Sequence, residues 1–324
     1  MRSRPAGGRR SGDRAARRRI VVIVVFGSLN LDLSVAVEHL PAPGETVRGP
    51  GYGVHPGGKG ANQALAARRA GAAVALVARC GRDAFAGLAL AELRGAGVGL
   101  SALAEDAAPT GCALIAVDRR GENQIVVASG ANEALRAGDL PEALLGPDRL
   151  LLLQMEVPPA ESRRAAERMR EAGGRVLLNL APAAPLPAET LPLLDWLVVN
   201  EGEARTLAGH LGCRDEPAAL AARCGCSLLV TLGADGALAV AGGRRWRVGA
   251  LAVEARDTTA AGDAFVGVFA AALDAGRPLP EALRRASVAG GLACTRPGAQ
   301  PSLPTAAEIE AALPRLAPAE PMEG

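Results

Sequence analysis

Three apolar runs in the middle of the chain decide the fold: Arg175-Val176-Leu177-Leu178-Asn179-Leu180, Trp196-Leu197-Val198-Val199 and Ser227-Leu228-Leu229-Val230-Thr231-Leu232. Each run is as short as a buried strand, and stretches rich in Ala, Leu, Arg and Glu, such as 160–172 and 203–209, lie between runs of this kind. This alternation is typical of βαβ units, whose strands are parallel and whose helices cover both faces of the sheet. We therefore predict an α/β fold with a doubly wound, mostly parallel sheet.

The alternation extends over most of the sequence. We expect further strands at 20–26, 73–79 and 150–155, and further helices at 60–70, 84–94 and 279–295. Residues 31–56 and 111–128 break the rhythm with shorter, half-polar strands and turns, which predicts a small separate sheet that covers one end of the main sheet as a lid. We expect one domain over 20–314, a basic N-terminal extension at 1–19 and a C-terminal tail at 315–324.

Charge and composition restrict the partners. The net charge is only +2, and residues 1–19 hold eight arginines against one acid, Asp13, so the rest of the chain is acidic and gives no reason to expect nucleic-acid binding. The extension has no apolar core of a secretory signal. A disordered extension is the simplest interpretation, with an organellar presequence or a basic arm for RNA as the alternatives.

Apolar runs and cysteines indicate where the protein works. No apolar run reaches the roughly 18–20 residues that span a bilayer, so we expect no membrane association. The six cysteines have no Cys-x-x-Cys spacing, and Cys224-Gly225-Cys226 is too tight for the usual zinc pair. We predict reduced cysteines that mainly pack in the interior, and a cytoplasmic protein.

A glycine-rich segment, residues 55–62, contains the single lysine of the chain, Lys59. A lysine in a chain that otherwise uses arginine suggests a site that needs a compact ammonium and not a planar guanidinium, although one lysine can also arise by chance. The pair Gly57-Gly58 before an Ala-rich stretch would let a ligand approach free N–H groups at a helix start. The spacing matches a Walker A loop, but Gly60 stands where that loop needs Ser or Thr for Mg²⁺, so we reject a Walker A site.

Polar residues also follow the first predicted strand. Gly27-Ser28-Leu29-Asn30-Leu31-Asp32 has no G-x-G-x-x-G pattern, so it does not predict a dinucleotide site. Asn30 and Asp32 would point to one side and could hold vicinal hydroxyls. Taken alone, however, Asn-x-Asp is weak evidence and usually marks only a turn.

The segment Asp257-Thr258-Thr259-Ala260-Ala261-Gly262-Asp263 precedes an apolar helix predicted at 264–273. Backbone N–H groups of 260–262, with the helix dipole, would form an anion hole for a transferring phosphoryl group. Asp263 beside that hole could accept the proton of an attacking hydroxyl. An Asp in a first helical turn is also common for structural reasons, so this segment alone leaves both interpretations open.

The motifs occur in a characteristic order: Gly27 to Asp32, Pro43-Gly44-Glu45-Thr46, Gly57 to Ala64, Gly130-Ala131-Asn132, Asn179-Leu180-Ala181-Pro182-Ala183, Asn200-Glu201-Gly202-Glu203, Thr231-Leu232-Gly233, Asp257 to Asp263 and Gly298-Ala299-Gln300-Pro301-Ser302. In this order they resemble the ribokinases, which belong to the phosphofructokinase-B type of carbohydrate kinases. The resemblance runs from about Val21 to Ile309.

The resemblance implies a sugar site and a catalytic centre. In this family the sugar hydroxyls are held by the residues that match Asn30, Asp32, Gly58, Lys59, Asn62 and Glu156. Apolar residues matching Ala113, Ile115 and Val127 cover the furanose from the lid. Asp263 matches the catalytic base, and Ala260, Ala261 and Gly262 match the anion hole.

The resemblance also implies the nucleotide and metal sites. Asn200 and Glu203 match an N-x-x-E element that organises Mg²⁺ largely through water, and Thr231, Gly233 and Gly236 match the ATP-binding loop. Ser287 stands where an Asn or His often contacts adenine, which predicts looser base binding. A K⁺ activator would be held by residues matching Asp257, Thr259, Ala293, Arg296, Gly298 and Ser302.

The function implied is ATP-dependent phosphorylation of D-ribose at O5, giving D-ribose 5-phosphate and ADP. The alternatives are another sugar or nucleoside kinase of this family, acting on deoxyribose, fructose or adenosine, or a non-catalytic sugar sensor. The partners implied are D-ribose, ATP and a second copy of the chain that pairs through the lid strands.

Overall fold

The computed structural model describes residues 22–322, so the basic extension predicted at 1–19 lies outside the described residues. The main sheet has the order β14-β13-β12-β11-β10-β9-β8-β1-β4-β5. Its parallel part contains β1 (Val22–Phe26), β4 (Ala73–Gly81), β5 (Gly99–Asp106), β8 (Arg149–Leu153), β9 (Arg175–Asn179), β10 (Trp196–Asn200) and β11 (Ser227–Thr231). Three antiparallel strands extend one edge: β12 (Ala237–Ala241), β13 (Arg244–Val248) and β14 (Glu320–Met322). The predicted doubly wound, mostly parallel sheet is confirmed.

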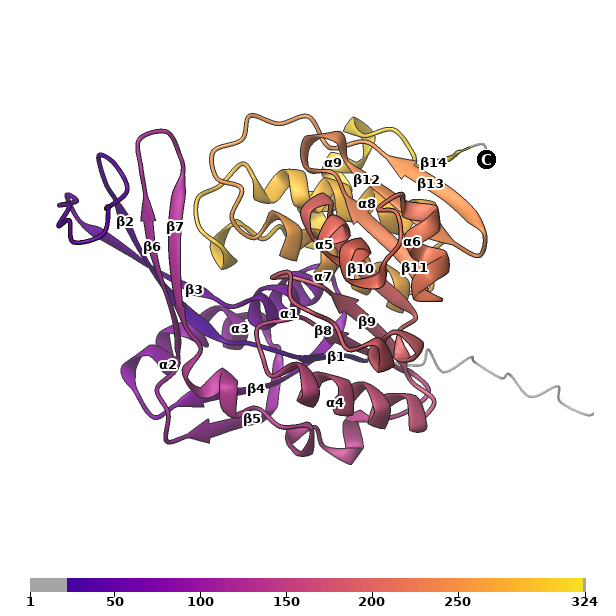
Figure 1. Cartoon of the computed structure of the whole chain (residues 1–324), viewed down its shortest axis with the longest axis horizontal. Helices are drawn as coiled ribbons and strands as arrows, with labels where there is room; N and C mark the ends of the chain where they lie inside the picture. The colour runs from indigo at the N-terminus through magenta and orange to yellow at the C-terminus, as the bar shows by residue number, and fades with distance from the viewer. Residues whose placement is uncertain (1–21, 323–324) are drawn as a thin grey trace, which may run out of the picture.

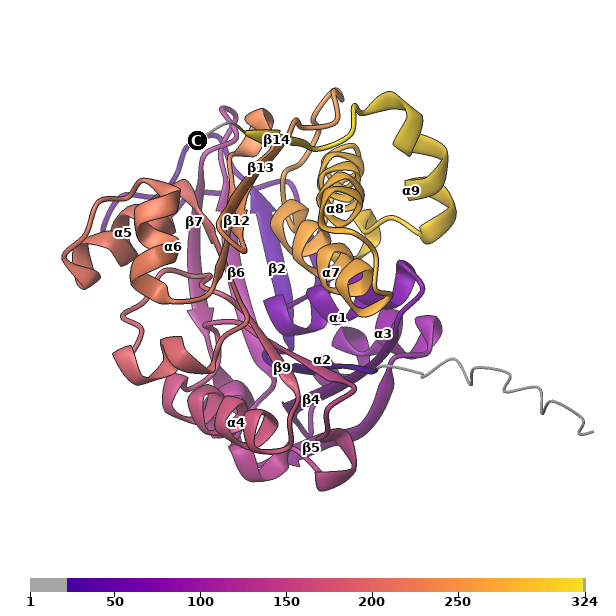
Figure 2. The same cartoon turned by 90° about the vertical axis from the view of Figure 1, so that its right-hand side faces the viewer.

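Helices cover both faces of this sheet (Figures 1 and 2). One layer contains α1 (Lys59–Arg69), α3 (Ala91–Ala96), α7 (Ala261–Asp274), α8 (Leu279–Ala293) and α9 (Ala306–Ala312), and the other contains α4 (Pro159–Glu171), α5 (Glu201–Leu211) and α6 (Pro217–Cys224). Successive side chains of β1 enter opposite cores: Ile23 and Val25 pack with the first layer, Val24 and Phe26 with the second. Burial on both faces explains why the strand sequences are continuously apolar.

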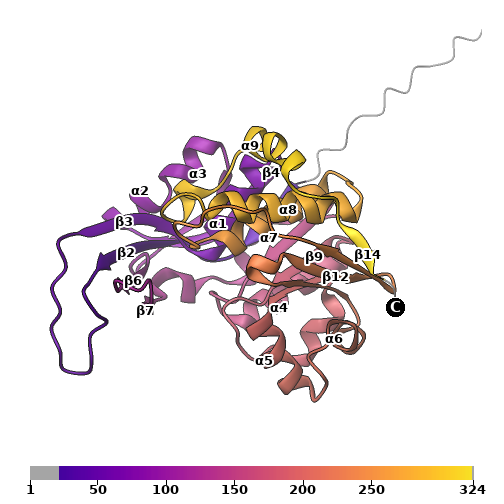
Figure 3. The ribbon, with the colours of Figure 1, turned by 90° about the horizontal axis from the view of Figure 1, so that it is seen from above.

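A smaller sheet forms the lid, with the order β3-β2-β6-β7. Its strands are β2 (Asn30–Ala36), β3 (Tyr52–Gly57), β6 (Gly111–Val117) and β7 (Asn123–Ala128); β2 is parallel to β6, and the other pairs are antiparallel. The sheet projects from one side of the molecule, and the connection between β2 and β3 reaches farthest out (Figures 1 and 3). Asp32 pairs with His55 and Ala113, so these three residues share one face of the lid sheet.

Two details differ from the sequence prediction. The helix expected at 84–94 is two short helices, α2 (Ala84–Ala89) and α3, which meet at Leu90. The tail expected from residue 315 contains β14, which pairs with β13 and therefore belongs to the main sheet. The prediction missed it because Glu320-Pro321-Met322 has neither length nor alternation, and proline is tolerated only in an edge strand such as this one.

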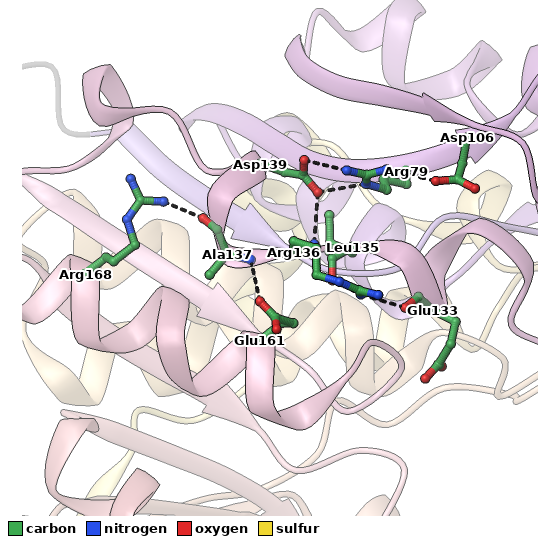
Figure 4. A network of polar contacts seen from close by, with 9 residues as sticks. All are labelled: Arg79, Asp106, Glu133, Leu135, Arg136, Ala137, Asp139, Glu161 and Arg168. Atoms are coloured by element: carbon green, nitrogen blue, oxygen red, sulfur yellow. Dashed lines mark hydrogen bonds and ion pairs between the residues drawn. The ribbon is translucent and has the colours of Figure 1, made fainter.

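A charged network fastens the segment that follows the lid to the main sheet (Figure 4). Arg79 on β4 donates two hydrogen bonds of 2.8 Å to Asp139 and one of 2.8 Å to Asp106, and Asp139 also accepts the Arg136 N–H at 2.9 Å. Burial alone would raise the pKa of Asp139, but Arg79 and the Arg136 N–H hold it below its usual value. The network fixes Arg136 and Asp139, and with them the segment that contains Asn132, against β4.

Helices α1 and α7 lie unusually close together. A Cβ placed on Gly267 would meet the Ala66 Cβ and the Gln63 carbonyl oxygen at 2.6 Å and the Ala67 nitrogen at 3.0 Å. Only glycine leaves room for this contact, which brings the start of α1 against the start of α7. Within residues 22–322, no helix has the length and apolar character needed to cross a membrane.

Candidate active site

A cavity of about 220 Å³ lies where the main sheet, α1, α5 and α7 meet. It is lined by polar and small residues from six segments, among them Lys59, Asn179, Asn200, Glu203, Thr231, Thr258, Ala260, Gly262 and Asp263. The strands β9, β10 and β11 all end there, as is typical of ligand sites in open parallel sheets. The structure therefore brings together residues predicted for catalysis, for ATP and for Mg²⁺.

Asp263 occupies the first turn of α7 and is almost fully buried. Its Oδ2 accepts a hydrogen bond from Asn62 Nδ2 and its Oδ1 accepts one from Gln63 Nε2, both at 2.9 Å. The oxygen Asn62 Oδ1 is buried and has no hydrogen-bond partner. Two amide donors thus keep the carboxylate oriented, and one of these amides has an acceptor to offer a ligand.

The predicted anion hole adopts a strained backbone. Ala260 has φ = +58°, the only positive φ of a non-glycine residue that the described backbone contains. This left-handed residue precedes α7 and turns the chain into the helix, at a cost of about 1–2 kcal/mol. The Ala261 N–H donates to the Thr258 carbonyl at 3.2 Å, so a bound anion would have to replace that bond.

Lys59 begins α1 and faces several carboxylates. Asp263 is the largest cause that raises the pKa of Lys59 above its ordinary value; burial opposes it, while Glu156, Glu203 and Asp32 add to it. The ammonium is therefore charged at neutral pH. Lys59 lines the same cavity as Asn200 and Glu203, so the residue predicted for the sugar lies beside the residues predicted for Mg²⁺ and the phosphates.

Two further acids lie near Lys59. Burial raises the pKa of Asp32 to about 7, with Glu156 and Asp263 adding to this effect and Lys59 opposing it. Glu156 Oε2 accepts hydrogen bonds from Ser28 Oγ at 2.6 Å and from the Lys59 N–H at 2.8 Å. The predicted sugar carboxylates are thus gathered around one cation, where their free oxygens can accept hydroxyl protons.

Asn132 determines which way Asn30 points. Asn132 Oδ1 accepts the Leu29 N–H at 2.9 Å, so its Nδ2 must donate, and it does so to Asn30 Oδ1 at 2.7 Å. Asn30 is buried and its own Nδ2 is consequently the atom left for a ligand. Gly58, with φ = +87°, passes so close that a Cβ there would lie 2.8 Å from the Asn30 nitrogen.

The apolar residues predicted to cover the sugar lie on the lid. Ala113, Ile115 and Val127 belong to β6 and β7, and the pairing of Asp32 with Ala113 and of Ala113 with Val127 places these residues in one row. By the alternation of β6, Ile115 lies on the same face. The face predicted to cover the sugar is therefore continuous with Asp32.

Asn200 and Glu203 also form a capping box at the start of α5. Asn200 Oδ1 accepts the Glu203 N–H at 2.8 Å, and Glu203 Oε2 accepts the Asn200 N–H at 2.7 Å. Burial raises the pKa of Glu203, while the Asn200 N–H and Lys59 oppose the rise. Both residues line the cavity, so helix capping and ligand binding are compatible here.

The predicted nucleotide residues are divided between two places. Thr231 ends β11 and lines the cavity, and Gly233 and Gly236 follow it with φ of +56° and +93°. A side chain on Gly236 would overlap the Val248 carbonyl oxygen. Ser287 is buried in α8 and its Oγ donates to the Gly249 carbonyl at 2.6 Å, so its hydrogen already has a partner.

The segment predicted to hold a monovalent cation is organised by Asp257. Its Oδ1 accepts the Thr259 N–H and its Oδ2 the Gly298 N–H, both at 2.8 Å. Ser302 Oγ donates to the Ala299 carbonyl at 2.8 Å, and the Ala293 carbonyl accepts the Arg296 N–H at 3.3 Å. The six predicted ligands thus come from two loops that Asp257 ties together.

Proteins of known family and structure resemble this chain in sequence and fold. Residues 22–306 match the model of the pfkB family of carbohydrate kinases. A ribokinase of Haemophilus influenzae is 37% identical over 297 residues, which cover 88% of this chain and 96% of that protein. The structure of a ribokinase from Thermotoga maritima superposes with a TM-score of 0.84 at 35% identity, covering 91% and 99% of the two chains. An Arabidopsis thaliana ribokinase solved with ribose and ATP gives 0.81 at 32% identity, covering 90% and 98%.

A sheet that ends in a polar cavity, with a buried aspartate at a helix start and a lysine beside it, is the arrangement of a phosphotransferase. The chain belongs to the pfkB family of carbohydrate kinases. The resemblance and the fold predicted from the sequence are thereby confirmed.

Sequence reasoning gave no role to several residues that the structure places in or behind the site: Ser28, Gln63, Asn132, Gln154, Asn179 and Thr258. All of them except Gln154 lie inside the motifs that carry the resemblance, which was the available signal. Gln154 carries none, because it only follows an apolar strand.

Proposed function

We propose that the protein is an ATP-dependent kinase that phosphorylates D-ribose at O5. The observation that carries this proposal is the position of Asp263, buried at the helix start beside Lys59 and held by two amides. The likeness to ribokinases over almost nine-tenths of the chain supports ribose as the sugar.

In the reaction, the O5 hydroxyl of ribose attacks the γ-phosphorus of ATP. Asp263 takes the hydroxyl proton, the new O–P bond forms, and the bond to the β–γ bridging oxygen breaks to release ADP. The N–H groups at the start of α7 stabilise charge on the transferring group, and Lys59 adds a positive charge from the other side. Asn30, Asp32, Asn62 and Glu156 orient the sugar, while the lid excludes water that would otherwise hydrolyse ATP.

The donor sets suit the two cations implied. Mg²⁺ prefers oxygen ligands and keeps several waters, which suits the carboxylate of Glu203 and the amide of Asn200 as partners of a hydrated ion. K⁺ would be held by the Asp257 carboxylate, the Ser302 hydroxyl and the carbonyls of Thr259, Ala293, Arg296 and Gly298. Mg²⁺ supplies charge neutralisation on the phosphates when bound, and K⁺ supplies stiffness to the loop before α7.

The deciding experiment is a coupled ADP-release assay with Mg·ATP over ribose, deoxyribose, fructose and adenosine, each with K⁺ and with tetramethylammonium as the inert salt. We expect turnover to be highest with ribose and to rise with K⁺. Higher turnover with another acceptor would change the substrate that we assign but leave the mechanism as proposed. If none of the four acceptors supports ADP release, and the folded protein still binds ribose, the result would favour the sugar sensor.

A second copy of the chain is the partner we propose for the outer face of the lid. This face exposes Val54, Leu114 and Val126 beside Tyr52, over a hollow of about 730 Å³ that Phe85 and Leu88 also line. Every residue of β7 is exposed. An apolar face of this kind is self-complementary in a two-fold dimer, which would also cover the exposed sheet.

Light scattering coupled to gel filtration tests this dimer. Val126→Glu should convert a dimer to a monomer, whereas Ala222→Glu, the same kind of change on exposed α6 at the far side of the main sheet, should not. A wild-type monomer at micromolar concentration would refute the dimer. The six cysteines are unpaired, which agrees with the cytoplasmic location that we propose.

A further inference from the structure

Behind the catalytic aspartate lies a chain of buried amides with no assigned role. Gln154, directly after β8, donates from Nε2 to Gln63 Oε1 at 2.7 Å, and Gln63 on α1 donates from Nε2 to Asp263 Oδ1 at 2.9 Å. Gln63 is fully buried and Gln154 nearly so. Three segments far apart in the sequence therefore meet in one line that ends on the carboxylate.

The chemistry of the three side chains fixes which atom donates and which accepts in each of these hydrogen bonds. An ionised carboxylate can only accept hydrogen bonds, so Gln63 must turn its NH₂ to Asp263 and its oxygen to Gln154. Gln154 must then present its own NH₂. Its remaining oxygen is buried without a partner, so the orientation of Gln154 is set by Gln63 and by the tight fit against Gly27.

Asn62 contacts the other oxygen of Asp263 but differs from Gln63 in one respect. Its Oδ1 is buried and unpartnered, whereas both polar atoms of the Gln63 side chain are used. A sugar hydroxyl that enters the site can donate to Asn62 Oδ1 and can draw the Asn62 amide away from Asp263 Oδ2. That oxygen then becomes available to take a proton, while Gln63 continues to hold Oδ1.

We infer that Gln63, oriented by Gln154, is the positioning residue of the catalytic base, and that Asn62 is the exchangeable amide released by the sugar. This inference rests on the proposed function and deepens it. Gln63 keeps the carboxylate aimed through the whole reaction, while Asn62 occupies the reactive oxygen only until substrate arrives.

The experiment compares Gln63→Met with Asn62→Leu in the ribose assay. Gln63→Met removes a hydrogen bond to a charged group, so kcat should fall about ten- to hundredfold, with the KM for ribose and for ATP little changed. Asn62→Leu should instead mainly raise the KM for ribose. Equal effects of both variants on kcat and KM would overturn the division of roles.

A pH profile shows whether Gln63 positions the catalytic base or only stabilises the fold. Loss of the Gln63 donor favours the protonated carboxyl, so the acidic limb of the kcat profile should move to higher pH by about one unit. The other charged groups around Asp263 and its neighbour Lys59, namely Asp32, Glu156 and Glu203, are unchanged in the variant, as is Lys59 itself. Gln154→Met, the same change one step farther away, should shift the limb in the same direction by less.

A readout without turnover keeps the inference separate from the proposed function. The ¹³C resonance of the Asp263 carboxyl, identified by its loss in Asp263→Asn, can be titrated in the free protein. Its midpoint should rise in Gln63→Met even if ribose proves not to be the substrate. An unchanged midpoint in a variant that melts like the wild type would refute the role of Gln63.

Discussion

The close contact of α1 with α7 yields a quantitative prediction. In Gly267→Ala the new methyl carbon would lie 2.6 Å from both the Ala66 Cβ and the Gln63 carbonyl oxygen. Relief to an ordinary contact needs the two helices to separate by roughly 0.8 Å, which is the kind of overpacking that costs about 1–3 kcal/mol. Alanine regains about 1 kcal/mol through its better helix propensity.

The net loss of stability should therefore be small, about 0–2 kcal/mol, or a few degrees in Tm. The effect on catalysis should be larger, because the same shift pulls Asn62 and Gln63 away from Asp263, and a displacement near 1 Å can reduce turnover by about 100-fold. The variant should thus fold but turn over slowly.

Thermal melts and the coupled assay measure both effects. The matched control is Gly209→Ala on α5, where a Cβ would meet nothing within 4 Å, so stability should stay equal or rise and turnover should be unaffected. If Gly267→Ala has wild-type kcat, the tight helix contact does not position the site and the reasoning is wrong.

Three further predictions concern individual side chains. Asp263→Asn should lower kcat by about 10²–10⁴ while calorimetry still detects ribose and ATP binding; Asp274→Asn, the same change at the other end of α7, should leave kcat near wild type, and equal losses would contradict the base assignment. Because Asp32 has a pKa of about 7 in the folded protein, raised from 3.8, the native state binds the extra proton between these values. Stability should fall as pH rises from about 4 to 7, whereas ribose affinity should rise through pH 7 if the ionised carboxylate accepts a hydroxyl; a pH-independent Kd would argue against that contact. Asn132→Ala leaves the buried Leu29 N–H without its acceptor, so it should destabilise the protein by about 1–3 kcal/mol and raise the KM for ribose more than that for ATP.

The parallel core was predictable because its strands are buried on both faces and are therefore continuously apolar. The antiparallel edge was not, since Ala237–Ala241 is alanine-rich and Glu320–Met322 is too short to show a pattern. The residues predicted for catalysis came from glycine-rich segments whose local chemistry is distinctive. The residues that orient them could not be predicted in this way. Asn132 contacts Asn30 across 102 residues and Gln154 contacts Gln63 across 91, and no local pattern encodes a contact at such separation.

Lys59 is the only lysine in 324 residues, and it lies in the cleft that also holds Asp263 and Glu203. Apart from the histidines, every other basic side chain is an arginine, whose guanidinium amine-directed reagents do not modify. Acylating probes, amine-coupled surfaces and lysine-specific proteases would therefore act, among the side chains, at this one position. Because its pKa is raised, Lys59 would be labelled at alkaline pH, with the labelled Lys59 peptide resolved from the labelled N-terminal amine. Protection of that peptide by ribose or ATP would then report occupancy without any measurement of turnover.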